Sequence, residues 1–384
     1  MNEEIRNRLI VIGERLRKAR ESLGYTQEEA SEKINIGRPR YSDIENGKRN
    51  VPLKELYRFC EFYGRPLEYF LKETLALDNG FKVLFRKTEG DQEVAKVIAE
   101  FENLCERMRE LEEIMEIRIK PPVPPDYEYE KSREWFWGKH YADQERKKLD
   151  LGQAPISNLH QILEEKCGLK IFYLPIPEEK EIFGMFTFDE KIGGCILINT
   201  NPTVGNQLFS LAHEYAHFVF HKKKLGIISF KKEEDTLDER LANCFASNFL
   251  MPEDAVKDIY NVRIKNRKDI AAEDVFYFSH YFGVSFKAMV FRLNNLKLLN
   301  DELKNKLVTE TCVTAVRRVM GISEPEISKS RFPPLYEHLC RKAYQQGRVT
   351  TRKFAQFLEI PLYEAMERGR EIRGIAQDEP TDTI

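Results

Sequence analysis

A run of histidines at four-residue spacing restricts the fold of this chain more than any other feature. Residues 211–221 read Leu-Ala-His-Glu-Tyr-Ala-His-Phe-Val-Phe-His and hold three of the seven histidines in an otherwise apolar stretch. Side chains four residues apart lie on one face of an α-helix, so the spacing predicts a helix over residues 208–220. Such a helix suits either a metal site or an amphipathic core element that happens to carry histidine.

The first two histidines form an HExxH motif. His213 and His217 can direct their imidazoles at one metal ion, and Glu214 is placed to act on the attacking water rather than on the metal. Zinc lowers the pKa of its water to about 7, and a neighbouring carboxylate can take the proton as the water attacks a carbonyl. The motif therefore predicts a zinc peptidase, provided that a third ligand lies within reach.

His221 is a poor third ligand. It lies about one turn beyond His217 on the same helix face, and each four-residue step rises about 6 Å. Three ligands in a straight column cannot all close on one ion. We therefore interpret His221 as a helix cap or as a side chain that supports a ligand from behind.

A second predicted helix, over residues 237–252, offers a better third ligand. One of its faces carries Glu239, Ala242, Asn243 and Ala246. The alanines would let this helix approach the first one closely, so Glu239 is the predicted ligand and Asn243 its neighbouring support. Asp238 and Glu234 are competing carboxylates that point elsewhere in this register.

The region before the histidine helix predicts a small sheet. Helices are expected over residues 131–148 and 156–166, followed by strands over 169–174, 182–188 and 195–199. Gly193-Gly194 supplies a hairpin turn between the last two strands. We expect a small antiparallel β-sheet packed by helices.

The N-terminal region predicts five short helices over residues 9–72. Thr26 and Glu29 form a capping box at the start of the second helix, and a three-residue break separates that helix from the third. Residues 37–49 carry four basic and two acidic side chains, in a chain whose formal net charge is −2. Two short helices joined by a tight turn are the geometry that places the second helix in the DNA major groove.

Residues 24–71, GYTQEEASEKINIGRPRYSDIENGKRNVPLKELYRFCEFYGRPLEYFL, resemble the Xre-type (Cro-like) helix-turn-helix along their full length. The resemblance implies a five-helix, lambda-repressor-like domain that binds double-stranded operator DNA. It also implies phosphate contacts by Gln27 and Lys48, with Arg38, Arg40, Tyr41 and Ser42 facing the groove. The alternative is a protein-binding module that shares only the fold.

A heptad pattern follows over residues 91–119. Its apolar positions are Val94, Val97, Phe101, Leu104, Met108, Leu111 and Met115. A proline-rich run at residues 121–125 ends the helix. Three heptads suit a homodimeric coiled coil or a long helix packed on its own chain, and both remain open.

The passages AHEYAH and ERLANCFASNFLMP resemble the ImmA/IrrE family of metallo-endopeptidases. The resemblance extends to CILINTNPTVGNQLFSLAHEYAHFVFH and to residues 282–299, FGVSFKAMVFRLNNLKLL. It implies a zincin-like, thermolysin-like core, a Zn²⁺ cofactor, and a repressor of the Xre type as the cleaved protein.

The expected fold class is mostly α with a small antiparallel sheet (α+β). We predict a helix-turn-helix domain over residues 1–75, a helical connector over 76–130, the metallopeptidase domain over 131–300 and a helical extension over 301–384. Seven scattered cysteines without a CxxC pair, and no recognisable signal peptide or membrane span, predict a cytoplasmic protein without a membrane partner.

Two functions from different classes remain. The first is a DNA-binding transcriptional regulator with a working zinc endopeptidase that cleaves a repressor or antitoxin-like protein, either another chain or itself. The second is a non-catalytic regulator or antitoxin whose peptidase-like domain senses a ligand or binds a partner protein. Retention of Glu214 favours the first, because a sensor does not need a general base.

Overall fold

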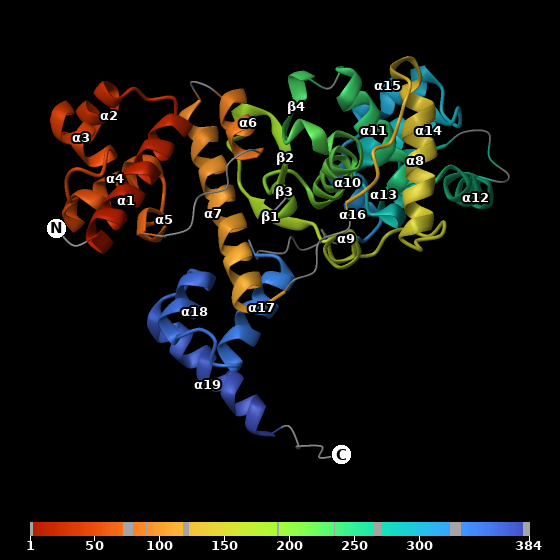
Figure 1. The fold of residues 1–384 in the computed structure, drawn as a ribbon. Helices are drawn as coiled ribbons and strands as arrows, with labels where there is room; N and C mark the ends of the chain where they lie inside the picture. The colour runs from red at the N-terminus through yellow and green to blue at the C-terminus, as the bar shows by residue number, and fades with distance from the viewer. Residues whose placement is uncertain are drawn as a thin grey trace. The chain divides into compact units, whose positions relative to one another are not determined.

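The computed structural model describes residues 3–71, 80–88, 91–117, 123–189, 192–233, 235–264, 267, 270–322 and 332–378 (Figure 1). Contacts divide the chain into two compact units. The first comprises Met1–Pro121, Asp189–Gly193 and Phe332–Ile384, and the second comprises Pro122–Phe188 and Gly194–Arg331. The predicted extension over residues 301–384 is thus split, and its larger part belongs to the N-terminal unit. Within the described residues, no helix is long and apolar enough to cross a membrane.

The first unit begins with the predicted five-helix domain. Its helices are α1 (Glu3–Ser22), α2 (Gln27–Lys33), α3 (Arg38–Glu45), α4 (Leu53–Tyr63) and α5 (Leu67–Leu71). Thr26 caps α2 and forms the predicted capping box with Glu29, while Gly64 ends α4 in the left-handed conformation. Leu16, Ala30 and Phe59 are fully buried, so the short helices share one apolar core.

Helices α6 (Gly80–Lys87) and α7 (Gln92–Ile114) follow in the same unit. The heptad positions Phe101, Leu104, Met108 and Leu111 of α7 are buried within the chain. Part of their cover comes from helix α17, which packs on α7 (Figure 1). The heptad seam is therefore an intramolecular packing surface, and the structure does not support a homodimeric coiled coil through it.

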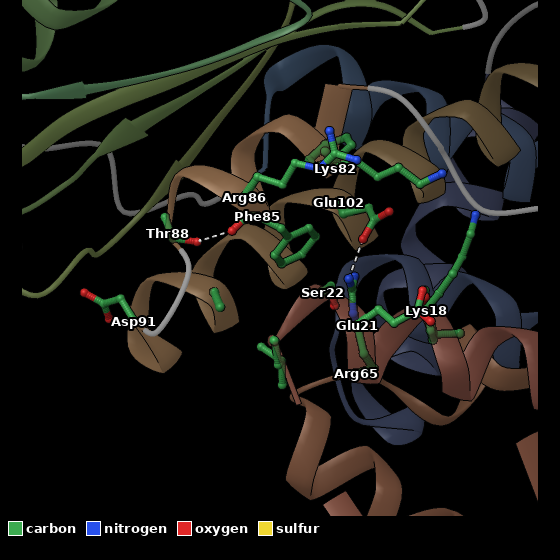
Figure 2. A pocket seen from close by; sticks show the side chains of 15 residues that line it. Lys18, Glu21, Ser22, Arg65, Lys82, Phe85, Arg86, Thr88, Asp91 and Glu102 are labelled. Carbon is green, nitrogen blue, oxygen red and sulfur yellow. Dashed lines mark hydrogen bonds and ion pairs between the residues drawn. The ribbon is translucent and has the colours of Figure 1, made fainter. Parts of the chain in front are cut away.

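Arg65 anchors the five-helix domain to α7. Its buried guanidinium donates to the carbonyl oxygen of Ala99 at 2.6 Å and forms an ion pair with Glu102. A pocket of about 250 Å³ lies beside this ion pair, between the end of α1, α6 and α7 (Figure 2). Lys18 and Lys82 are among the residues that line it.

Three C-terminal helices complete the first unit. They are α17 (Pro334–Gln345), α18 (Thr351–Leu358) and α19 (Leu362–Asp378). Lys353 forms an ion pair with Glu110 of α7 at 2.5 Å, and Arg348 donates to the carbonyl oxygen of Ile114 at 2.7 Å. These contacts explain why the C-terminal helices belong with the N-terminal unit rather than with the residues that precede them.

The second unit contains a four-stranded sheet. Its strands are β1 (Lys170–Leu174), β2 (Ile182–Asp189), β3 (Gly193–Asn199) and β4 (Gly226–Phe230), in the order β1-β3-β2-β4. β1 runs parallel to β3, and β2 runs antiparallel to β4. The mostly helical fold class is confirmed, but the sheet is mixed rather than purely antiparallel. Sequence alternation locates strands without specifying their neighbours, and β4 was not predicted at all.

Helices pack around this sheet. They are α8 (Glu134–Lys148), α9 (Leu159–Cys167), α10 (Val204–His221), α11 (Leu237–Leu250), α12 (Glu253–Ile264), α13 (Ala272–Phe282), α14 (Phe286–Asn295), α15 (Asp301–Glu310) and α16 (Val313–Val319). Short 3₁₀ turns lie at Lys131–Arg133, Glu178–Lys180, Lys222–Lys224 and Lys231–Glu233. α10 contains the predicted histidine helix and packs against α11, which in turn packs against α8. The two helices that carry the candidate metal ligands are therefore held in direct contact.

Candidate metal centre and nucleic-acid interface

The structure brings His213, His217 and Glu239 together. Glu239 Oε2 lies 2.9 Å from His213 Nε2, and Glu239 Oε1 lies 3.3 Å from His217 Nε2. The two histidine Nε2 atoms are 3.0 Å apart. Within the described residues these three form a buried group that could hold a metal ion.

Close packing of α10 and α11 makes this convergence possible. Ala242 and Ala246 of α11 are fully buried, as expected for small residues where two helices approach closely. Glu239 lies on the first turn of α11, and its carboxylate can therefore reach both histidines on α10. The side-chain spacing is predictable from the sequence, whereas the approach of the two helices comes from tertiary packing.

The donor set fits a tetrahedral zinc ion. Ligand atoms about 2.0–2.1 Å from zinc in tetrahedral geometry lie about 3.3 Å from one another. The three separations here are 2.9, 3.0 and 3.3 Å, slightly shorter than those of a loaded site. Two imidazoles and one carboxylate are also ligand types that zinc prefers in catalytic sites.

Asn243 orients the first histidine. Its Oδ1 accepts a hydrogen bond from His213 Nδ1 at 2.9 Å. An amide oxygen can only accept, so His213 Nδ1 carries a proton, and Nε2 is the ring atom that faces Glu239 and His217. This hydrogen bond is compatible with the supporting role predicted for Asn243, which stays a prediction.

His221 lies behind the second histidine. Its Nδ1 is 2.9 Å from His217 Nδ1, and its Nε2 is 3.3 Å from Asp238 Oδ1 and 3.1 Å from the Tyr129 hydroxyl. His221 therefore contacts His217 from behind and is not one of the three residues that converge. Asp238, a competing ligand in the sequence analysis, pairs with His221 and with Lys224 instead. The other competitor, Glu234, lies outside the described residues.

Burial and mutual contact shift the pKa values of the cluster. Burial lowers the pKa of His217 to about 3, so its imidazole is neutral and can act as a ligand. Burial opposes ionisation of Glu239, but hydrogen bonds from the two histidines hold its pKa below the usual value. Burial also lowers the pKa of His213, yet the Glu239 carboxylate raises it overall. A proton and a metal cation thus compete for the same position at His213.

Glu214, the predicted general base, is fully buried beside the cluster. Its Oε1 accepts a hydrogen bond from the Ser229 hydroxyl of β4 at 2.6 Å. Gly184 pairs with Ser229 across the sheet, and a Cβ atom at residue 184 would lie 2.6 Å from Glu214 Oε1. Neither residue is predictable from the sequence, because a serine and a glycine far from the motif carry no signal without the sheet register.

The predicted DNA contacts divide into exposed and buried residues. The predicted set is Gln27, Arg38, Arg40, Tyr41, Ser42 and Lys48. Arg38 and Lys48 are exposed, and Arg38 lies 3.9 Å from Glu28. Arg40 pairs with Glu55 at 2.6 Å. The structure leaves Arg38 and Lys48 the most accessible cations of the set.

Tyr41 does not face the groove. It is fully buried, and its hydroxyl forms a hydrogen bond with the Tyr63 hydroxyl. Tyr41 and Ile44 lie three residues apart on the inner face of α3, and both are buried in the domain core. The groove-facing role implied for Tyr41 is therefore wrong. Ser42 is half-buried and remains a prediction.

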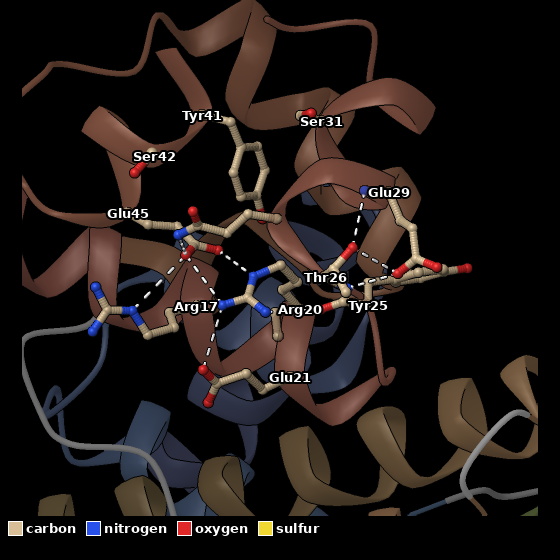
Figure 3. A network of polar contacts seen from close by, with 12 residues as sticks. Arg17, Arg20, Glu21, Tyr25, Thr26, Glu29, Ser31, Tyr41, Ser42 and Glu45 are labelled. Atoms are coloured by element: carbon tan, nitrogen blue, oxygen red, sulfur yellow. Dashed lines mark hydrogen bonds and ion pairs between the residues drawn. The ribbon is translucent and has the colours of Figure 1, made fainter. Parts of the chain in front are cut away.

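Arg17 and Arg20 converge on Glu45 (Figure 3), and Gln27 also donates to it. The buried Glu45 carboxylate accepts from Gln27 Nε2 at 2.7 Å and from Arg20 Nε at 2.7 Å, and Arg17 Nε lies 3.8 Å away. This network joins α1, α2 and α3, and so fixes the helix-turn-helix. The phosphate contact of Gln27 remains a prediction. The hydrogen bond from Gln27 Nε2 to Glu45 would fix the orientation of the Gln27 amide group in such a contact.

The two sites define a class of protein. A helix-turn-helix domain is joined in one chain to a domain that carries a His-His-Glu cluster of the metallopeptidase type. Residues 16–70 match the family described as helix-turn-helix, and residues 164–294 match the family described as IrrE N-terminal-like domain, a peptidase M78 family. The chain thus carries an Xre-type domain followed by an IrrE/ImmA-like peptidase domain, as the sequence motifs indicated.

One curated relative and one solved structure are similar to parts of the chain. The HTH-type transcriptional regulator ImmR of Bacillus subtilis (strain 168) is 38% identical over 60 residues. That alignment covers 16% of this chain and 47% of ImmR, so the chain spans about half the length of this relative. The crystal structure of ComR from Streptococcus suis aligns with 96% of this chain and 93% of that chain, at 11% identity and a TM-score of 0.15.

Proposed function

We propose that this chain is a DNA-binding regulator whose second domain is a zinc-dependent endopeptidase acting on a repressor or antitoxin-like protein. The observation that carries the proposal is the convergence of His213, His217 and Glu239, with Glu214 next to the first ligand in sequence. The helix-turn-helix match supports the DNA-binding half. Both activities reside in one chain, so DNA binding and proteolysis belong to one regulatory switch.

The chain's own residues divide the chemistry among them. His213, His217 and Glu239 would hold the zinc ion, which when bound acts as a Lewis acid on the substrate carbonyl and acidifies water. Glu214 takes the proton from the attacking water and delivers it to the leaving amine. Asn243 keeps His213 in the tautomer that ligates, and Ser229 holds the Glu214 carboxylate in place.

A Glu214→Gln variant tests this function. Gln keeps the size of the side chain but cannot take a proton, so we expect the bound zinc to remain and cleavage to fall by about 10²- to 10⁴-fold. The control is His217→Ala, which should lose both zinc and cleavage. Purified zinc-loaded chain is incubated with helix-turn-helix repressors, including a second copy of itself, and the products are analysed by mass spectrometry.

A non-catalytic function remains the second candidate, and one observation favours it. His213, His217, Glu214 and Glu239 are all buried, whereas a catalytic zinc site keeps a position open to substrate. In that case the domain would bind a ligand or a partner protein around a structural metal. Zinc retained by the chain, without cleavage of any repressor offered, would contradict the peptidase and support this alternative.

A further inference from the structure

Helices α18 and α19 repeat the backbone of the helix-turn-helix formed by α2 and α3. Thr26 caps α2 and Thr350 caps α18, and each side chain accepts from the backbone N–H three residues on at 3.2 Å. After the first helix, Asn35 and Glu359 both adopt the left-handed conformation, with φ of 57° and 53°. Each second helix then begins three residues later.

The hydrogen bonds and burial of the two turns also correspond. Ile36 N donates to Ser31 O at 2.9 Å, and Ile360 N donates to Ala355 O at 3.1 Å. The inward positions are buried in both helix pairs. The corresponding residues are Ala30 and Phe354, Ser31 and Ala355, Ile34 and Leu358, and Tyr41 and Ala365. α18 and α19 therefore form a second helix-turn-helix, within the same unit as the first.

The outward faces of the two second helices differ in chemistry. α3 begins with the exposed Arg38, whereas the equivalent face of α19 presents Leu362, Tyr363 and Met366, which are 52, 68 and 48% exposed. DNA recognition needs cations for phosphates and hydrogen-bonding groups for base edges. An apolar face of this kind fits a protein surface instead. We propose that this face of α19 binds a second copy of this chain.

The α19 face is complementary to itself. Arg370 is exposed further along the same face, and the exposed Glu367 lies between Tyr363 and Arg370, so the surface is apolar in its first half and charged beyond it. A two-fold interface requires a patch that fits its own copy. In an antiparallel pairing centred on Met366, Arg370 of each copy would lie opposite Leu362 of the other, within reach of the neighbouring Tyr363 ring for a favourable cation–π contact. Antiparallel helices also bring the positive end of each macrodipole toward the negative end of the other.

Pairing through α19 would supply a dimer interface. The heptad seam of α7 does not supply one, because that seam is buried within the chain. The patch is small compared with the roughly 20–30 residues per side of a standard interface, so we expect a reversible dimer with Kd in the micromolar range. Two linked reading domains then bind a two-fold DNA site more tightly through effective concentration.

Sedimentation equilibrium of the full-length chain across the micromolar range tests the pairing. We expect a monomer–dimer equilibrium that Met366→Glu weakens at least tenfold, since two buried carboxylates would face each other at the two-fold axis. The matched control is Val262→Glu, which changes a 78% exposed apolar residue of α12 and should leave self-association unchanged. Both variants should keep the melting temperature of the parent.

Two outcomes would overturn the proposal. One is a full-length chain that stays monomeric throughout this range, or that associates equally with and without Met366→Glu. The other is a Tyr363→Ala variant that weakens binding to a random-sequence duplex without changing self-association, which would make the face a nucleic-acid surface. Neither outcome depends on whether the chain is a peptidase.

Discussion

Removal of the Asn243 side chain should weaken metal binding without unfolding the domain. The Oδ1 of Asn243 accepts from His213 Nδ1 at 2.9 Å, and this bond sets both the ring orientation and the tautomer of the ligand. Loss of such a supporting contact typically reduces metal affinity by about 10- to 100-fold. Since tenfold in affinity corresponds to about 1.4 kcal/mol, we expect Asn243→Ala to cost about 1.4–2.8 kcal/mol of zinc binding.

The fold should tolerate the substitution. Ala242 and Ala246 already occupy the neighbouring positions of α11, and alanine is the best helix former. The side chain of Asn243 is only half-buried, so the free energy of unfolding of the metal-free protein should fall by no more than about 1 kcal/mol. The effect on zinc affinity should therefore exceed the effect on stability.

Competition with a chromophoric zinc chelator measures the affinity of each variant. Asn243→Asp is the informative control, because a carboxylate still accepts from His213 Nδ1 and should hold zinc at least as well as the parent. Ser247→Ala, one turn further along α11, controls for a change of helix sequence alone. An unchanged zinc affinity in Asn243→Ala, or an equal loss in Asn243→Asp, would refute the orienting role of this hydrogen bond.

Three further substitutions probe other parts of the chain. Gly184→Ala would put a Cβ atom 2.6 Å from Glu214 Oε1 and displace this carboxylate. We expect retained zinc and about 100-fold slower cleavage in a peptide assay. Cleavage as fast as that of the parent would mean that activity does not depend on this position of the Glu214 carboxylate. Glu45→Ala leaves Arg20 without its buried partner and should lower the free energy of unfolding by about 3 kcal/mol in urea titrations. A change below about 1 kcal/mol would contradict a central role for the hydrogen-bond network around Glu45. Lys48→Ala should weaken binding to specific and random DNA alike and reduce the salt slope by about 1, whereas a loss confined to one sequence would make Lys48 a base contact.

Local sequence patterns were sufficient for the helices that carry the candidate ligands and for the helix-turn-helix. The four-residue spacing of His213 and His217 predicts a helix whatever surrounds it, because both imidazoles must share one face. The capping box at Thr26 likewise depends on residues three apart, and the structure contains it. Glu239 was identified from the helical face that it shares with two alanines, and the structure brings it to the two histidines.

Predictions failed where the outcome depended on packing between distant segments. Tyr41 was assigned to the groove by resemblance to the Xre-type helix-turn-helix, yet in helix α3 its side chain lies in the domain core. The heptads of α7 predict an apolar seam but not its occupant, and here α17, more than two hundred residues later, packs on that helix. The order of the strands was also out of reach, since β1 pairs with β3 rather than with the next strand in sequence.

The sequence by itself determined which side chains are candidates for the chemistry, because an HExxH helix and a capped helix-turn-helix are set by contacts within a few residues. Only the tertiary structure decided how those side chains are supported. Ser229 and Gly184 meet Glu214 through a strand pairing, and Asn243 reaches the candidate ligand His213 only once α10 and α11 are packed. Such contacts join residues distant in the chain, and their geometry arises from burial of the whole apolar core rather than from any local preference.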